Sequence, residues 1–224
     1  AAMRFVDAVA RLEPLPDPLP PPHDALMPVR TDGGTWRFPG AGAPPGGRRA
    51  AVLVLIYPDD IGDARVVLIE RPTHDGRHHS GEVSFPGGKA EPDDVDAVAT
   101  ALREASEEVG LDPATAGLRV VGLLDRLWIP VSDFAVTPVV AIAPRRPDLV
   151  PASAEVARII EPPLATFLPD APLGTVERTI RGWSVRSGHY EVDGLSVWGA
   201  TARVLSQLGA VLAGATARSE PPPG

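Results

Sequence analysis

The sequence predicts a domain of the α/β (α+β) class, and three observations support this. Residues 50–57 read AAVLVLIY, an unbroken apolar run that is typical of a strand buried on both faces. Residues 95–109 place apolar side chains at helical spacing, which predicts a helix with one face on a core. Further short apolar runs, separated by turn-forming residues, indicate strands before and after this helix.

The chain divides into an arm, one domain and a tail. Residues 1–47, rich in proline and glycine, are expected to form an N-terminal arm that wraps the domain or a partner. Residues 48–216 would form the domain, and 217–224 a disordered tail. Strands are expected at 50–57, 65–70, 81–85, 118–127, 135–143, 175–183 and 189–197, and helices at 3–12, 95–109 and 198–215.

Composition argues against several classes of protein. The 224-residue chain has a net charge of −8, which does not favour a nucleic-acid surface. It has no cysteine, which excludes disulfides and thiolate chemistry. The sequence shows no secretory leader and no apolar run long enough to cross a bilayer. We therefore expect a cytoplasmic protein that binds neither nucleic acid nor membrane.

The helix expected at 95–109 carries three carboxylates in an unfavourable place. It would begin after Asp93 or Asp94 and end at Gly110, with one apolar face formed by Val95, Val98, Leu102, Ala105 and Val109. Glu104, Glu107 and Glu108 would cluster away from that face, although like charges near a helix C-terminus destabilise it. The cluster is either a solvated acidic surface or a Mg²⁺ site. Gly87 and Gly88, just ahead of the helix, allow close approach of backbone or phosphate and favour the metal site.

The stretch from Phe85 to Leu111 resembles the Nudix box, whose pattern is G-x5-E-x7-R-E-U-x-E-E-x-G-U with U aliphatic. Three departures stand out: Asp94 replaces the first glutamate, one extra residue follows it, and Ala105 occupies an aliphatic site. The resemblance implies a Nudix fold, a mixed β-sheet sandwiched between helices. It also implies that Glu104, Glu107 and Glu108 bind Mg²⁺ or Mn²⁺, with Glu104 and Glu108 the firmest pair.

Arg103 resembles the arginine that orients a neighbouring glutamate through a charge-assisted hydrogen bond. The alternative is a surface arginine that pairs with Glu107 one helical turn away.

The loop before the box resembles the coenzyme A pyrophosphatase branch of the same superfamily, which has R-S-x-x-L-R-x-H-x-G before an FPGG turn. Arg71, Arg77 and His79 match it, but Pro72, Gly76 and one additional residue do not. The arginines would bind phosphate, with Gly87 and Gly88 beside them. The alternatives are surface arginines and a turn histidine.

Two later segments also resemble this branch. Residues 155–164 are similar to its E-V-x-x-h-x-x-P-L segment, h being hydrophobic, and 198–201 to its W-G-x-T. In several Nudix enzymes an acidic residue in the first region supplies a further ligand or the general base, which makes Glu155 a candidate. Glu155 is otherwise a carboxylate at a helix N-terminus.

The expected activity is metal-dependent hydrolysis of a nucleoside diphosphate derivative, in which metal-bound water attacks one phosphorus. Coenzyme A or acyl-coenzyme A would give 3′,5′-ADP and 4′-phosphopantetheine. Two alternatives stay open: another substrate on the same fold (ADP-ribose, NADH or a nucleoside triphosphate), or a binding module without catalysis. A homodimer through the arm is compatible with the sequence but not required by it.

Overall fold

The part of the chain that the structure describes, in a computed structural model, comprises residues 2–33, 47–72, 82–129, 132–180 and 182–214. Its helices are α1 (Phe5–Leu12), α2 (Ala97–Val109), α3 (Pro113–Ala116) and α4 (Gly199–Leu212), with short 3-10 turns η1 (Asp24–Leu26) and η2 (Leu164–Phe167). Its strands are β1 (Val29–Arg30), β2 (Arg48–Pro58), β3 (Ala64–Val66), β4 (Leu68–Glu70), β5 (Val83–Ser84), β6 (Gly87–Lys89), β7 (Arg119–Leu123), β8 (Leu127–Ile129), β9 (Phe134–Ile142), β10 (Arg158–Ile160), β11 (Gly174–Ile180), β12 (Trp183–Val192) and β13 (Leu195–Val197). None of these helices is both long and apolar enough to span a membrane.

The largest sheet of the described residues is mixed, and β2 and β9 form its middle. The strand order is β3-β2-β9-β7, with β6 also paired to β2 and β8 also paired to β9. Strands β2 and β9 run parallel, from the pair Arg48 and Phe134 to the pair Ile56 and Ile142, while the other pairs are antiparallel. The apolar run at 50–57 is therefore the central buried strand that the sequence predicts.

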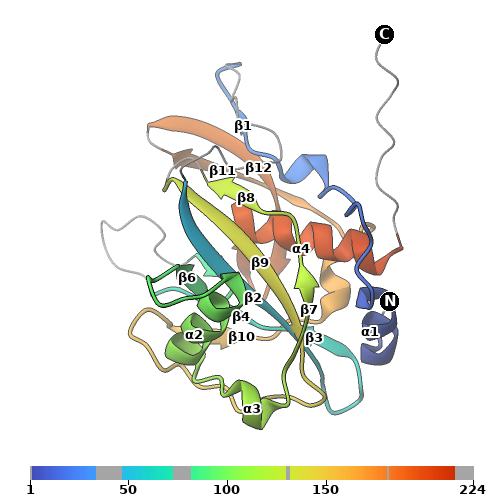
Figure 1. Ribbon diagram of the computed structural model, residues 1–224. Coiled ribbons are helices and arrows are strands. Elements are labelled where there is room, and N and C mark those ends of the chain that lie inside the picture. Colours follow the sequence, from blue (N-terminus) through green and yellow to red (C-terminus); the bar gives the residue numbers. More distant parts are fainter. Residues whose placement is uncertain (1, 34–46, 73–81, 130–131, 181, 215–224) are drawn as a thin grey trace.

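Both faces of this sheet are covered, because alternate side chains of β2 enter two different cores. Leu53 and Leu55 pack with the apolar side of α2, whereas Val54 and Ile56 pack with α4 and η2. Helix α2 therefore covers one face of the sheet and α4 the other (Figure 1). The expected mixed sheet between helices is confirmed.

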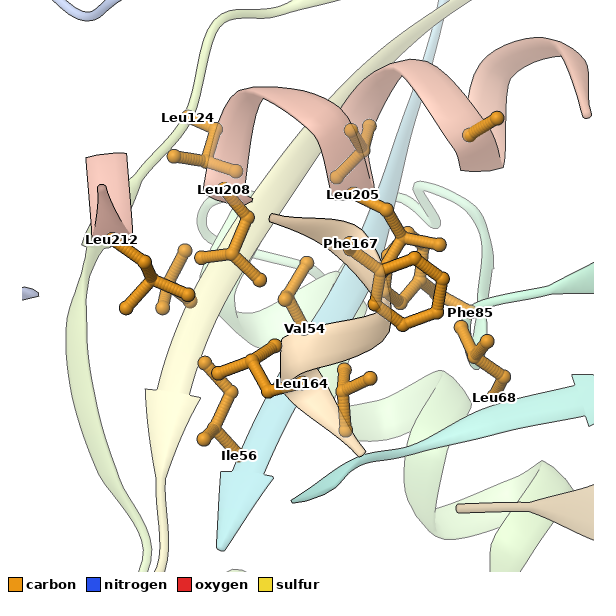
Figure 2. Packing of buried hydrophobic residues seen from close by; sticks show 14 of the residues in the cluster. Val54, Ile56, Leu68, Phe85, Leu124, Leu164, Phe167, Leu205, Leu208 and Leu212 are labelled. Carbon is orange, nitrogen blue, oxygen red and sulfur yellow. The ribbon is translucent and has the colours of Figure 1, made fainter. Parts of the chain in front are cut away.

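The core beneath α4 is the larger of the two and joins distant parts of the chain. Figure 2 shows Leu205, Leu208 and Leu212 of α4 pointing toward Phe167 of η2 and Ile56 of β2. A fully buried side chain of this kind contributes roughly 1.5–3 kcal/mol. Helix α4 is thus held firmly over the sheet, and this fixes the residues in its first turns.

The start of the chain lies against the domain. Ala8 and Leu12 of α1 are fully buried, and the Arg11 guanidinium donates to the backbone oxygen of Leu212 at the end of α4. Leu26 is also fully buried, and β1 pairs with β12. Residues 34–46 and the tail at 217–224 lie outside the described residues, so the division of the chain at residue 47 stays a prediction.

The expected strand at 65–70 is wrong in one respect, because it is two strands. Strand β3 pairs with β2, and β4 pairs with β5 and β10 in a separate sheet. Val67 lies between them, and its backbone nitrogen donates to the Leu55 oxygen at 3.1 Å. Every side chain from Val66 to Ile69 is buried, so the sequence has no alternation that would reveal the change of sheet.

Two other strand boundaries differ from expectation. The strand expected at 118–127 is interrupted after Leu123, and β8 then includes Trp128, which was expected in a loop. The expected connection between 183 and 189 lies inside β12, where Arg186 pairs with both Glu177 and Val29. Residues 184–188 are polar or glycine apart from Val185, and pairing of β12 on both edges overrides their low average strand propensity.

Helix α2 begins later than predicted. The side chain of Asp96, not Asp93 or Asp94, caps it by accepting from the Ala99 nitrogen at 2.8 Å. Val95 therefore precedes the helix and is 87% exposed, which corrects its assignment to the apolar face. Gly110 ends the helix at φ 66°, in the left-handed conformation, as expected.

Candidate active site

Gly87 and Gly88 lie where α2 meets the edge of the central sheet. They belong to strand β6 and not to a free turn, and a side chain at either position would collide with a neighbour. A Cβ on Gly87 would lie 2.6 Å from the Val52 Cα, and one on Gly88 would lie 2.5 Å from the Glu104 carboxyl carbon. The glycines thus allow β6 to approach β2 on one side and a glutamate of α2 on the other.

Glu108 is a buried carboxylate, although the sequence placed it away from the apolar face. It is 5% exposed, on the same side of α2 as Ala105 and Val109. Its Oε2 accepts a hydrogen bond from the Gly87 nitrogen at 2.8 Å. Burial raises the pKa of Glu108 to about 7, against the opposing effects of this hydrogen bond and of Arg71. The surrounding groups therefore do not offset the cost of burying the negative charge of Glu108, and a nearby cation would stabilise that charge.

Glu104 and Glu107 lie in different surroundings. The Glu104 side chain is 17% exposed and touches the space above Gly88, and burial raises its pKa. The Glu107 side chain is 60% exposed and meets only Arg103 among the ion pairs of the described residues. The structure therefore brings Glu104 and Glu108 together at the glycine pair and leaves Glu107 outside.

Arg103 connects several parts of the box. Its guanidinium donates to both Asp94 oxygens, at 3.1 Å from Nε and 3.0 Å from Nη2. It also donates to Glu104 and to Glu107, each at 3.2 Å, and to the Lys89 oxygen of β6. Both expectations for Arg103, orientation of a glutamate and pairing with Glu107, describe contacts that are present. The sequence offered Asp94 as a helix cap, but in the structure it pairs with Arg103, which holds the pKa of Asp94 well below its usual range.

Arg71 and Glu155 form an ion pair at the other side of β6. The Arg71 guanidinium donates to a Glu155 oxygen, and the Glu155 side chain is 64% exposed. Arg71 lowers the pKa of Glu108 and Glu155 raises it, so both charges act at that carboxylate. Glu155 lies in a turn and not at a helix N-terminus. Arg77 and His79 lie outside the described residues.

A cavity of about 450 Å³ opens on the α4 face of the sheet, next to the same glycines. Arg71, Gly87, Gly88 and Lys89 line one end of it. Aromatic and aliphatic walls follow, formed by Trp128, Ile129, Phe134, Val136 and Trp198. Ligand pockets typically have volumes of roughly 300–1,000 Å³ with mostly apolar walls and a few polar groups. The size and lining of this cavity suit an organic ligand with an anionic end.

The cavity and the two carboxylates approach the glycines from opposite faces of the sheet. Ala50 and Val52 of β2 line the cavity, whereas Glu104 and Glu108 come from α2 on the other face. Among the described strands β6 pairs with β2 alone, so it forms an edge there. A ligand that extends past this edge would meet the cavity walls and the carboxylates at once.

The two carboxylates fit one hard divalent cation. Mg²⁺ commonly binds one or two protein carboxylates and completes its shell with water and substrate phosphate. Glu104 and Glu108 supply oxygen donors, and burial leaves both carboxylates undercompensated. Within the described ranges, no three His, Cys, Asp or Glu side chains form a ready-made metal cluster. Besides these two carboxylates, the ligands available in the described part of the chain would be water and substrate.

Sequence reasoning missed two further cavity residues, Ser84 and Arg203. Both line the cavity, and each has a buried polar atom with no hydrogen-bond partner among the described residues. Arg203 follows the W-G-x-T stretch by two positions, and that proximity is a signal that the sequence offered.

Comparison with known proteins identifies the family. A model of the NUDIX domain matches residues 47–151. Nudix hydrolase 15, mitochondrial, of Arabidopsis thaliana is 37% identical over 73% of this chain, and this chain spans 58% of that relative's length. The uncharacterized Nudix hydrolase NudL of Photorhabdus laumondii is 36% identical over 72% of this chain and 83% of its own length. A Nudix hydrolase from M. smegmatis, RenU, is 25% identical over 62% of this chain and 79% of that chain at a TM-score of 0.44, too low a likeness to assign a function. With its box, its glycine-backed carboxylates and these relatives, the chain belongs to the Nudix hydrolase family.

Proposed function

We propose that this protein is a divalent-cation-dependent pyrophosphohydrolase and that coenzyme A or an acyl derivative is its substrate. One observation carries the proposal: Glu104 and Glu108 both rest on the glycine pair at which the cavity opens. An anionic diphosphate placed there would have oxygen ligands for a cation on one side and an apolar pocket on the other.

Each residue of the site has a distinct task in this proposal. Glu104 and Glu108 would hold the Mg²⁺ or Mn²⁺ ion, which when bound neutralises charge on the diphosphate and acidifies water. Arg103 fixes Glu104 by a charge-assisted hydrogen bond, and the Gly87 nitrogen fixes Glu108. Glu107 is exposed and accepts a hydrogen bond from Arg103. It would help to position Arg103 and would contact the metal only through water.

Hydrolysis breaks the bridging P–O bond and forms a new P–O bond to the oxygen of water. One proton of that water must leave, and one must reach the departing phosphate. Glu155 lies beside Arg71 and is exposed, so its carboxylate is our candidate for accepting the first proton. This role requires Arg71 to leave Glu155 for the substrate phosphate, for which a guanidinium provides a bidentate fork.

The resemblance to the coenzyme A branch and the shape of the cavity support the substrate. Trp128 and Phe134 both line the cavity, where their rings would contact a base or a pantetheine chain. The Arg48 guanidinium lies 4.1 Å from the centre of the Phe134 ring and holds that wall in place. An adenine ring and a slim amide chain both suit such walls.

A substrate panel tests the proposal. The purified protein is incubated with Mg²⁺ or Mn²⁺ and with coenzyme A, acetyl-coenzyme A, ADP-ribose, NADH or a nucleoside triphosphate, and the products are identified by mass spectrometry. We expect 3′,5′-ADP and 4′-phosphopantetheine from coenzyme A. Turnover of ADP-ribose, NADH or nucleotides alone would favour the second substrate class, and tight binding without turnover would favour a binding module.

Predictions about the cellular setting accompany this proposal. We keep a cytoplasmic location and a small-molecule nucleotide partner as predictions, and we expect no binding of nucleic acid or membrane. A homodimer stays a prediction that light scattering would test.

A further inference from the structure

The first turns of α4 carry a positive charge that the mechanism above does not use. Arg203 lines the cavity, and its Nε is buried without an acceptor among the described residues. Burial alone lowers the pKa of Arg203, with no contribution from a carboxylate of the described chain. A guanidinium stays protonated even so, because its ordinary pKa lies so high. Within the described part of the chain, the half-buried Arg203 side chain therefore has no carboxylate in contact with it.

Two other groups that suit an anion lie on the same wall. The N-terminus of α4 has no side-chain cap within the described chain, and Gly199, Ala200 and Thr201 of its first turn line the cavity. The free backbone N–H groups of a helix start attract negative charge. Ser84 of β5 also lines the cavity and keeps a buried hydroxyl without a partner among the described residues.

The relative positions of these groups are fixed by a contact between α4 and β5. The Thr201 hydroxyl donates to the Val83 oxygen at 3.1 Å, which ties the first turn of α4 to the strand that ends at Ser84. The Thr201 hydroxyl proton is thus already used, while the Arg203 Nε and the Ser84 hydroxyl have no partner among the described residues. An oxyanion with several acceptor oxygens would satisfy both at once.

These groups belong to other elements than the carboxylates that would hold the cation. Glu104 and Glu108 come from α2 on the opposite face of the sheet, and the cavity runs between the glycine pair and α4. A ligand that satisfies both ends must therefore carry two anionic groups with an apolar part between or beside them.

We propose that Arg203, Ser84 and the N-terminus of α4 form a subsite for a phosphate monoester of the substrate, a group distinct from the diphosphate that is cleaved. This inference rests on the proposed function for the identity of the substrate, in which that group is the 3′-phosphate on the ribose. Arg203 then determines specificity and takes no part in bond cleavage.

A substrate pair that differs only in this phosphate tests the proposal. We compare kcat/KM for coenzyme A and dephospho-coenzyme A in the unaltered protein, in Arg203→Gln and in the matched control Arg186→Gln, whose arginine pairs with Glu177 on the surface. A charge-assisted hydrogen bond corresponds to a factor on the order of 10 to 100. We expect R203Q to lose that factor with coenzyme A and little with dephospho-coenzyme A, and R186Q to change neither. An equal loss on both substrates, or no loss, would overturn the subsite.

Binding measurements separate this inference from the proposed function. Calorimetry with 3′,5′-ADP and 5′-AMP reports the extra phosphate without any turnover. If coenzyme A is not hydrolysed but 3′,5′-ADP binds more tightly than 5′-AMP and R203Q abolishes the difference, the substrate is wrong and the subsite holds. Equal affinity for the two nucleotides in the unaltered protein overturns the subsite even when coenzyme A is hydrolysed. Should R203Q fold poorly, Arg203→Lys and Ser84→Ala replace it in the same comparison, and each must reduce the preference for 3′,5′-ADP.

Discussion

Helices α2 and α4 cover opposite faces of one sheet. The arginine of α2 is paired with carboxylates, whereas the arginine of α4 has no carboxylate partner among the described residues. Helix α2 is capped by Asp96 and ends at Gly110, and its Arg103 reaches Asp94, Glu104 and Glu107. Helix α4 starts without a side-chain cap in the described chain, and its Arg203 has no carboxylate partner there. Most charges on α2 are matched within the protein, apart from its buried carboxylates, whereas the charge on α4 is matched by nothing described.

This difference separates two kinds of buried charge. A paired charge stabilises the fold when its hydrogen bonds are complete, and an unpaired one costs free energy until a ligand arrives. Glu108 and Arg203 are both of the second kind and have opposite signs. A ligand that carries a cation to one and a phosphate to the other would relieve both.

The largest effect is expected from a substitution of Glu108, the buried carboxylate of α2. Glu108→Gln removes the negative charge but keeps the shape that accepts from Gly87, so it should lower kcat/KM at least about 100-fold while the protein stays folded. Glu177→Gln, on the exposed surface of β11, is the matched control. Turnover and circular dichroism measured on both variants decide the outcome, and an unchanged rate in E108Q would remove Glu108 from the metal site.

Alanine substitutions at Gly87 and Gly88 should have different effects, one mainly on stability and the other mainly on activity. Gly88→Ala meets the end of the flexible Glu104 side chain, so it should displace that carboxylate and cost activity, on the order of 10-fold, with little loss of stability. Gly87→Ala meets backbone atoms of β2, so it should lower the free energy of unfolding by about 1–3 kcal/mol. Urea unfolding and turnover of both variants show which loss belongs to which glycine, and identical profiles would contradict the geometry.

Replacing Arg103 or Arg203 by Met compares the contribution of a paired arginine on α2 with that of an unpaired arginine on α4. Arg103→Met leaves Asp94 without its partner and should lower the free energy of unfolding by about 1–3 kcal/mol. Arg203→Met removes an unpaired charge and should leave the free energy of unfolding unchanged or raise it by about 1 kcal/mol. Urea unfolding of the ligand-free protein measures both. Equal destabilisation would mean that Arg203 has a partner within the protein.

The smallest effect concerns acid stability. Arg103 lowers the pKa of Asp94 in the folded protein, so the Asp94 contribution is complete above the unfolded pKa of about 4 and falls as the pH drops below it. The difference in unfolding free energy between the unaltered protein and Asp94→Asn should therefore shrink from pH 5 to pH 2.5. A difference that stays constant over that range would show that Asp94 and Arg103 do not interact in solution.

The sequence predicted what depends on local pattern. The buried strand at 50–57, the end of α2 at Gly110 and the nearness of Gly88 to the acidic helix all follow from residues close together in the chain. The sequence placed Glu108 away from the apolar face because of its charge, although it lies three residues after Ala105 and one before Val109, both of which are buried. Glu107 is exposed, as its placement away from that face predicted, but nothing in the box distinguished it from Glu104 and Glu108.

What the sequence did not predict depends on tertiary contacts. The split between β3 and β4 arises because the chain moves to a second sheet inside a uniformly apolar run. Arg203 follows the W-G-x-T stretch by two positions, but nothing in its local sequence shows that the side chain lines a cavity. Its burial follows from the packing of Leu205 and Leu208 beneath α4, which brings its part of the helix against β5.

The packing of α1 and α4 bears on how the chain can be shortened. The stretch that matches the family model, 47–151, includes β2, β9 and α2 but not α1, η2 or α4, which pack against the other face of the sheet. If residues 47–151 were expressed alone, Val54, Ile56 and Val140 would be exposed to water. An exposed apolar sheet face of this kind promotes aggregation. A working truncation must retain α1 together with everything through Leu212, because α1 and α4 pack together over the same core.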